Sequence, residues 1–105
     1  MTRPVSPMTL AASAQKASRL LKMMASEQRL MILCKLSEGE QSAGELTELV
    51  GLSQGAASQH LQKMRAEGLV GTRRDAQTIY YHLADEGAGQ VIDLLCRIYG
   101  EAEKA

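Results

Sequence analysis

The sequence is short of aromatic residues and of long apolar runs, and each shortage excludes a class of structure. Its 105 residues include three Tyr but no Trp and no Phe. The core therefore has to consist of Leu, Ile, Val, Met and Ala, a set that suits helices. No apolar run approaches the ~18 residues of a membrane-spanning helix, and a chain of this length has room for one domain with one modest core.

Cysteine is also scarce, and the N-terminal residues do not resemble a secretion signal. Cys34 and Cys96 are too few for a disulfide-rich scaffold. The first 15 residues hold one Arg and two Pro but no apolar block before a cleavage site. We therefore expect a cytoplasmic protein without a membrane partner, in which both thiols are reduced by default and each is, most simply, a small buried hydrophobe.

Charge is balanced over the whole chain but not along it. Twelve basic and twelve acidic residues give a net charge of zero, which argues weakly against a nucleic-acid partner. Residues 53–77 nevertheless hold four basic and two acidic residues, a net charge of +2, and residues 85–105 hold two basic and five acidic residues, a net charge of −3. The distribution of charge bears on DNA binding more than the sum does.

The stretch from Ser42 to Gly68 is the most informative part of the sequence. Ser42 is followed three residues later by Glu45, which is the capping-box pattern of a helix start. Gly51 allows a tight turn, Ser53 can cap a second helix, and Gly68 stands where a helix-ending glycine is expected. Two short helices joined by a turn with Gly indicate a helix-turn-helix; an αα-hairpin in another helical bundle is the alternative.

A β-hairpin is expected directly after this stretch. Residues 69–72 and 78–83 are rich in β-branched and aromatic side chains, and a polar, turn-prone segment with Arg73 and Arg74 lies between them. A helix-turn-helix followed at once by a hairpin with a basic tip is a winged helix. A solvated loop is the alternative for the two arginines, but their position after the second helix favours a functional role.

Three further helices complete the expected fold, which is mainly α with one β-hairpin. We expect a flexible tail over residues 1–8 and a single domain over residues 9–105, with helices at about 9–25, 26–39 and 85–103. The last helix carries an apolar stripe that is broad for so small a domain, so part of it is expected to pack on a second copy of the chain. The stripe consists of Val91, Leu94, Leu95 and Ile98.

The second helix of the helix-turn-helix has the side chains that a DNA-reading helix needs. Gln can bond adenine in a bidentate way in the major groove, and Ser can reach base edges or phosphate. Basic residues around the helix can contact phosphates, which gives affinity rather than sequence choice. The candidate DNA-binding residues are Ser53, Gln54, Ser58, Gln59, His60, Lys63, Arg65, Arg73, Arg74 and Gln77.

Catalysis and metal binding are rival functions that the sequence does not favour. It contains no G-x-S-x-G motif, no Gly-rich phosphate loop after a strand and no H-E-x-x-H motif, so no catalytic residue is expected. Cys34, His60, His82 and Cys96 are far apart in sequence, and no pair has the spacing of metal ligands. We therefore expect no enzyme activity, no cofactor and no bound metal.

These motifs together resemble one family along most of the chain. SAGELTELVGLSQGAASQHLQKMRAEGLV followed by RRDAQTIYYHL is similar to the ArsR/SmtB family of bacterial winged-helix repressors, with the match running over about residues 17–99. The MILC segment at residues 31–34 is similar to the thiol-sensing BigR, SqrR and HlyU branch. The resemblance implies a homodimer with the first and last helices at the interface. Leu20 and Met24 of the first helix therefore join the apolar stripe of the last helix in the expected dimer interface. It also implies a two-fold symmetric operator and repression relieved by a signal.

The metal sites of the resembled family are matched only in part. The cysteine-rich motif on the first helix of the helix-turn-helix is absent. On the last helix, Asp85 and Glu101 fall at the two carboxylate positions, but Gly87 and Ile98 stand where the family has histidines. Two ligands out of four make a poor site, so the resemblance does not predict a metal sensor.

The thiol site of the resembled branch is matched at one cysteine and shifted at the other. Cys34 matches the first cysteine, whereas the second would fall at Gly100, one helical turn after Cys96. Residues 96 and 100 share a face, so Cys96 is expected to face Cys34. The offset of about 6 Å along the helix axis favours a bridge with extra sulfur atoms over a simple disulfide.

The sequence thus predicts a cytoplasmic winged-helix repressor that binds double-stranded operator DNA as a homodimer. Its predicted signal is a reactive sulfur species or an oxidant that acts on Cys34 and Cys96. An ArsR-type repressor without a thiol switch, either metal-responsive or constitutive, is one alternative. A dimeric helical interaction module without DNA binding is the other.

Overall fold

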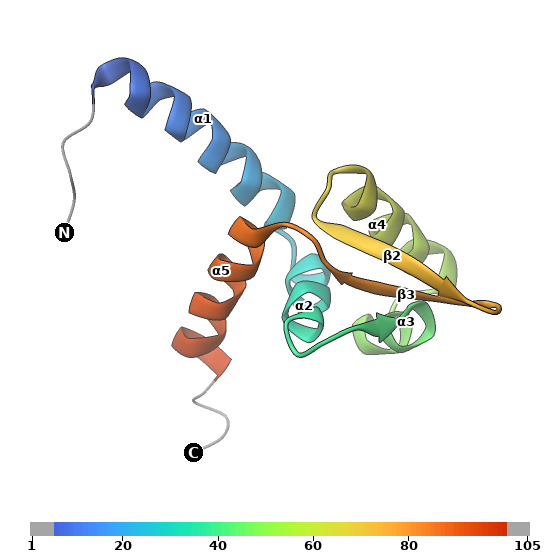
Figure 1. Cartoon of the computed structure of the whole chain (residues 1–105). Coiled ribbons are helices and arrows are strands. Elements are labelled where there is room, and N and C mark those ends of the chain that lie inside the picture. Colours follow the sequence, from blue (N-terminus) through green and yellow to red (C-terminus); the bar gives the residue numbers. More distant parts are fainter. Residues whose placement is uncertain (1–5, 101–105) are drawn as a thin grey trace.

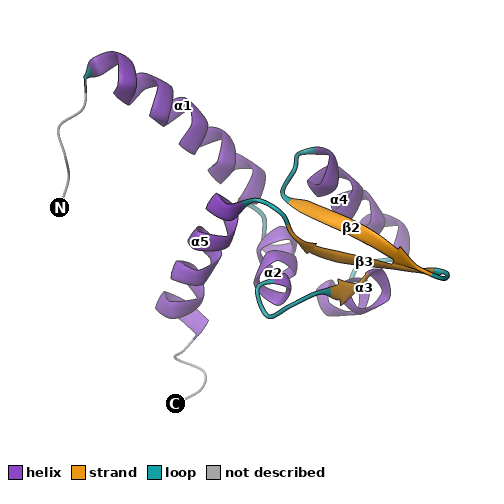
Figure 2. Ribbon diagram, viewed as in Figure 1, coloured by secondary structure: helices purple, strands orange, loops and turns teal. Residues whose placement is uncertain are grey.

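The computed structural model describes residues 6–100 and is mainly helical (Figure 1). This part of the chain contains five α-helices and a small antiparallel sheet with the strand order β1-β3-β2 (Figure 2). The elements are α1 (Pro7–Met24), α2 (Glu27–Leu36), β1 (Gln41–Ser42), α3 (Ala43–Val50), α4 (Gln54–Ala66), β2 (Val70–Asp75), β3 (Thr78–Leu83) and α5 (Glu86–Leu95), followed by a π-helical turn (Cys96–Gly100). The expected winged helix-turn-helix fold is confirmed.

Helix α2 lies at the centre of the core because its side chains are apolar over most of its circumference. Ile32 and Leu33 are fully buried, and Leu36 is nearly so. The helix contacts α3, α5 and β3, so it connects the helix-turn-helix, the sheet and the last helix. The other large buried side chains of the core are Met24, Leu46, Leu61, Met64, Leu69, Val70, Tyr81 and Ile92.

The ends of the helices differ from the sequence-based expectation in three places. Helix α1 begins at Pro7 rather than near residue 9, because Ser6 Oγ accepts a hydrogen bond from the Thr9 amide at 3.1 Å and Pro suits the first turn of a helix. Helix α2 ends at Leu36 rather than near residue 39. The regular part of the last helix ends at Leu95. The other expected residues of the tail (1–5) and of the last helix (101–103) lie outside the described residues.

The short strand β1 was not predicted. Gln41 pairs with Tyr81 and Ser42 with Tyr80, so β3 becomes the middle strand of the sheet. Two residues are too few to show a strand period in a sequence. The pairing exists because β3, much later in the chain, supplies the hydrogen-bonding edge.

Helix α1 extends away from the rest of the molecule (Figure 1). Residues 8–19 are exposed, and only Leu20, Met23 and Met24 near its C-terminal end are partly or fully buried. As an isolated helix, this exposed stretch of about 12 residues would be marginally stable in water, so a further surface is expected to cover its apolar side. No helix within residues 6–100 is long and apolar enough to cross a membrane.

Candidate DNA-binding surface and cysteine pair

The helix-turn-helix, α3 and α4, forms from local signals. The predicted capping box is present: Ser42 Oγ accepts a hydrogen bond from the Glu45 amide at 3.1 Å, and Glu45 Oε1 accepts one from the Ser42 amide at 2.8 Å. Gly51 ends α3 with a φ of 67°, which glycine adopts without strain. Ser53 caps α4, where its Oγ accepts a hydrogen bond from the Ala56 amide at 3.2 Å. The hydroxyl of Ser53, a predicted DNA contact, is thus engaged in capping.

The outward side of α4 carries a ridge of polar residues. Gln54, Gln59 and Gln62 are exposed, while Ser58 and His60 are half-buried. Ser58 Oγ accepts a hydrogen bond from Gln62 Nε2 at 3.2 Å. The sequence reasoning missed Gln62, although its position three residues after Gln59 indicates the same helix face.

The wing is a fully paired hairpin. Strands β2 and β3 pair along their whole length, and only Ala76 and Gln77 lie between them. Ala76 has a φ of 57°, in the left-handed region that two-residue hairpin turns use. Arg73 and Arg74 therefore lie in β2, which corrects the expected basic turn. Main-chain pairing continues through these residues because an antiparallel strand with one solvated face accepts polar side chains.

Arg73 and Arg74 differ in their surroundings. Arg73 Nε and Nη2 donate hydrogen bonds to the two carboxylate oxygens of Glu40, each at 2.8 Å, and the guanidinium lies over the Tyr80 ring at 4.5 Å from its centre. The hydrogen bond from Arg73 lowers the pKa of Glu40, so this carboxylate stays ionised at neutral pH. Arg74 is exposed and forms no ion pair with another residue in the described range. Arg74 is therefore the wing arginine that is open to a phosphate.

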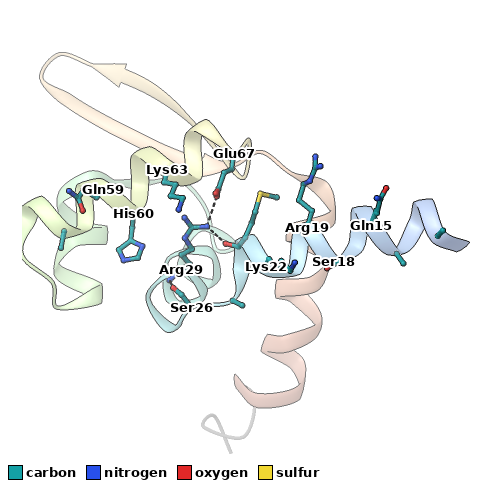
Figure 3. Close-up of a pocket in the computed structure, with 15 residues that line it drawn as sticks. Gln15, Ser18, Arg19, Lys22, Ser26, Arg29, Gln59, His60, Lys63 and Glu67 are labelled. Carbon is teal, nitrogen blue, oxygen red and sulfur yellow. Dashed lines mark hydrogen bonds and ion pairs between the residues drawn. The ribbon is translucent and has the colours of Figure 1, made fainter. Parts of the chain in front are cut away.

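Two grooves flank the ridge of α4. The larger, of about 990 Å³, lies between α4, the start of α2 and α1, and both His60 and Lys63 line it (Figure 3). The smaller, of about 670 Å³, lies between α4 and the wing and is lined by Arg65, Arg73 and Arg74. The predicted cations are thus divided between the two sides of the helix.

The two cysteines are in contact. Cys34 Sγ and Cys96 Sγ lie 2.9 Å apart, and both are free thiols. Ala88, Ile92 and Cys96 recur at four-residue spacing, which places Cys96 on the side of α5 that packs on α2. The expectation that Cys34 and Cys96 are too far apart for a simple disulfide is therefore wrong. Their sulfur–sulfur distance is only about 0.9 Å longer than a disulfide bond.

The contact with Cys96 keeps the Cys34 thiol protonated. The hydrogen bond with Cys96 raises the pKa of the Cys34 thiol to about 11, and burial and the charge of Cys96 act in the same direction. A thiol with such a pKa contains very little thiolate at pH 7, and the thiolate is the nucleophile. Cys34 is therefore a weak nucleophile for as long as Cys96 is unmodified.

An exposed apolar surface follows α5 and the π-helical turn. Leu94 is 48% exposed and Ile98 is 54% exposed; on α1, Leu21 is 54% exposed. Met24, predicted at the dimer interface, lies instead in the core of its own protomer with 2% exposure, because the last turn of α1 folds against the body. The half-buried members of the predicted interface are Leu20, Val91 and Leu95.

Asp85, one of the carboxylates that match a family metal site, caps α5. Its Oδ2 accepts a hydrogen bond from the Ala88 amide at 2.8 Å. Among residues 6–100, no three His, Cys, Asp or Glu side chains gather closely enough to hold a metal ion. The other matching carboxylate, Glu101, lies outside the described residues.

Sequence comparison finds bacterial regulators. A family described as "Bacterial regulatory protein, arsR family" matches residues 26–72, which span α2, the helix-turn-helix and the first part of the wing. The transcriptional activator HlyU of Vibrio cholerae serotype O1 is 45% identical over 101 residues, which make up 96% of this chain and 94% of that protein. The similarity therefore extends over nearly the whole length of both proteins.

Solved structures with the same fold include a repressor and a homodimer. The transcriptional repressor BigR from Xylella fastidiosa superimposes with a TM-score of 0.80 at 36% identity, covering 90% of this chain and 97% of that one. Mb0332 from Mycobacterium bovis, a homodimeric winged helix-turn-helix DNA-binding domain, superimposes with a TM-score of 0.72 at 28% identity, covering 98% and 94%.

Proposed function

The chain belongs to the ArsR family of bacterial regulatory proteins, and from that premise we propose that it is a transcriptional repressor that binds a two-fold symmetric operator as a homodimer. The similarity to the repressor BigR supports repression. Because HlyU is named an activator, activation is the alternative outcome for a regulator of this family. A regulator of this kind acts where the DNA is, so the proposed location is the cytoplasm.

The ridge of α4 between two cation-lined grooves is the observation that carries this proposal. Gln59 is exposed on the ridge, where it can bond adenine in a bidentate way. Lys63 on one side and Arg74 on the other can neutralise phosphates. The other proposed DNA-binding residues are Ser53, Gln54, Ser58, His60, Arg65, Arg73 and Gln77.

The exposed apolar side chains support the homodimer. Leu94 and Ile98 on the last helix, together with Leu21 on α1, form a surface that one protomer does not cover. In a two-fold dimer the same patch serves both protomers. Such a dimer would hold the two α4 helices about 34 Å apart, which is one turn of DNA.

The proposed signal is a peroxide or a polysulfide that reacts first at Cys96. With peroxide, the Cys96 thiolate takes one oxygen to become a sulfenic acid, and the oxidant leaves as an alcohol or water. Cys34 then attacks that sulfur, a Cys34–Cys96 disulfide forms, and water leaves. The two thiols together lose two electrons and two protons. The 2.9 Å sulfur–sulfur contact supports the second step, since the partner sulfur is already within reach. The raised pKa of the Cys34 thiol supports Cys96 as the first site of reaction.

A polysulfide produces the same Cys34–Cys96 disulfide by sulfur transfer. It gives one sulfur atom to Cys96, which becomes a persulfide, and Cys34 attacks the inner sulfur of that persulfide. Hydrosulfide leaves with the two electrons that the thiols lose. If Cys96 instead carries two added sulfur atoms, Cys34 attacks the sulfur next to the terminal one, hydrosulfide leaves, and the bridge keeps one extra sulfur atom.

Either bridge would join α2 to the end of the last helix within one protomer. The last helix also carries the proposed dimer surface, so the bridge would change the spacing of the two α4 helices. A coupling free energy of 1–3 kcal/mol, which is typical of allosteric proteins, corresponds to a five- to 150-fold loss of operator affinity.

The test is a mobility shift with a DNA fragment from the protein's own upstream region and with random DNA of equal length. Reduced protein should bind the upstream fragment more tightly than random DNA. Treatment with polysulfide or peroxide should release the protein from the fragment, and the intact mass of the protein should report the bridge. Cys34→Ser and Cys96→Ser should each bind and fail to release. Preference without release in the wild type would favour the repressor without a thiol switch, and no binding to either DNA would favour the helical interaction module.

A further inference from the structure

The larger groove beside α4 has a wall that belongs to the dimerisation helix rather than to the helix-turn-helix. Figure 3 shows Arg19 and Lys22 of α1 on one side and Lys63 of α4 on the other. Between them Arg29 Nη1 donates a hydrogen bond to Glu67 Oε1 at 2.9 Å. The groove therefore joins α4, which carries most of the proposed DNA-binding residues, to α1, which the family resemblance places at the dimer interface.

The groove carries uncompensated positive charge. Its lining holds four cations, Arg19, Lys22, Arg29 and Lys63, and one carboxylate, Glu67, a net charge of +3 without His60. Arg29 and Glu67 neutralise each other. The other three cations are exposed and form no ion pair with any residue between 6 and 100. A concave surface of this charge attracts an anionic partner.

The cations of α1 do not stand on its apolar side. At about 100° per residue, Lys22 lies roughly 140° and Arg19 roughly 160° around the helix from Ala17. Leu10 and Leu21, which are 57% and 54% exposed, lie within about 40° of Ala17 around the helix, on the apolar side. A partner subunit that covers this apolar side would leave the two cations directed into the groove.

The groove and the wing lie on different sides of α4. Lys63 and Arg65 are two residues apart and so point about 160° away from each other, the first toward α1 and the second toward the wing. The major groove of B-DNA is about 12 Å wide and admits one α-helix, so a sugar-phosphate strand passes on each side of that helix. The wing reaches only one of these strands.

We propose that the groove between α1 and α4 holds the sugar-phosphate strand on the side away from the wing, with Arg19, Lys22 and Lys63 as its phosphate contacts. Gln15 and Ser18, which also line it, add neutral hydrogen-bond donors. The inference rests on the proposed DNA-binding function and extends it to α1. Helix α1 would thereby contact the operator backbone as well as the second protomer.

The salt dependence of DNA binding tests this site. Affinity for the upstream fragment is measured in a series of KCl concentrations for the wild type and for Lys22→Gln. Each phosphate contact contributes about 0.9 to the slope of log K against log salt, so removing one phosphate contact from each protomer should reduce the slope by about 1.8. Arg19→Gln combined with Lys22→Gln should reduce it by about 3.6.

Lys16→Gln is the matched control, because Lys16 is a lysine on the same exposed stretch of α1 but does not line the groove. It should leave the slope nearly unchanged. Equal slopes for Lys22→Gln and Lys16→Gln would overturn the proposal, as would a Lys22→Gln protein that light scattering shows to be monomeric, since the groove would then belong to the dimer interface. If the wild type binds no duplex, the proposed function itself fails.

Discussion

Arg29 and Glu67 connect the end of α1 to the end of α4 through one buried ion pair. Arg29, 8% exposed, donates through Nη1 to Glu67 Oε1 at 2.9 Å and also to the main-chain carbonyl of Met23 (Figure 3). Met23 lies in the last turn of α1, and Glu67 follows the last residue of α4. One buried guanidinium thus fixes the end of α1 to the end of α4.

Removing the carboxylate of Glu67 should destabilise the fold. Glu67→Ala leaves the Arg29 charge buried with one partner fewer, a situation that costs 3–5 kcal/mol in a fully buried pair. Because the Glu67 side chain is 24% exposed, we expect about 1–3 kcal/mol, measured by urea unfolding of the reduced protein. Glu38→Ala, which removes the exposed partner of Lys35, is the control and should cost less than about 1 kcal/mol. Equal costs for the two variants would contradict a structural role for the buried pair.

Gln59 and Arg74 should affect DNA binding in different ways. Gln59→Ala should cost about 1–3 kcal/mol on the operator and little on random DNA, because a base contact specifies sequence. Arg74→Ala should weaken binding to both DNAs and reduce the salt slope by about one unit for each phosphate that the protein no longer binds. Competition binding on the two DNAs at several salt concentrations separates these patterns. Equal losses on both DNAs for Gln59→Ala would show that α4 does not read bases through this residue.

Glu40 should weaken DNA binding by keeping Arg73 of the wing in an ion pair. Glu40→Gln removes the carboxylate that Arg73 binds through two hydrogen bonds, so Arg73 becomes available to phosphate. We expect tighter binding to random DNA and a steeper salt dependence, while Arg73→Gln in the same background should cancel the gain. An unchanged salt slope in Glu40→Gln would mean that Arg73 stays on the Tyr80 ring and does not reach DNA.

A negative charge on the apolar surface of the last helix should prevent dimer formation. Leu94→Glu or Ile98→Glu places a carboxylate among side chains that a second protomer is proposed to bury, which gives monomer or insoluble protein. Leu49→Glu, at a leucine of α3 that is 37% exposed and outside this surface, should leave the assembly unchanged. Light scattering at micromolar concentration measures the result. A soluble monomeric wild type would refute the homodimer.

The reactivity of Cys34 should depend on Cys96 and on pH. The raised pKa of about 11 keeps Cys34 protonated at neutral pH, so its alkylation by iodoacetamide should be slow at pH 7 and accelerate as the pH rises toward 11. In Cys96→Ala, the hydrogen bond that raises this pKa is absent, so Cys34 should react faster at pH 7–8. Peptide mass spectrometry measures the rate at each cysteine. A Cys34 rate that Cys96→Ala leaves unchanged would mean that the sulfur contact does not control the proton.

Local signals in the sequence determined the helix-turn-helix and the existence of the hairpin. Ser42 with Glu45, Gly51 and Ser53 act on residues within one or two turns, so caps and turns follow from neighbours along the chain. The ten predicted DNA-binding residues all fall on α4, its cap or the wing, because the order of elements alone places them there. Which of them contact DNA stays a prediction.

Tertiary structure alone decided which side chains meet across the fold. Arg73 reaches Glu40 from 33 positions away, Arg29 reaches Glu67 from 38, and Cys96 reaches Cys34 from 62. No periodicity reports such contacts, because each depends on the packing of one element on another. Axial spacing along a single helix placed the sulfur atoms too far apart, whereas the packing of α5 on α2 brings them to 2.9 Å. The groove between α1 and α4 likewise depends on tertiary contacts, among them the hydrogen bonds by which Arg29 of α2 joins the ends of both helices.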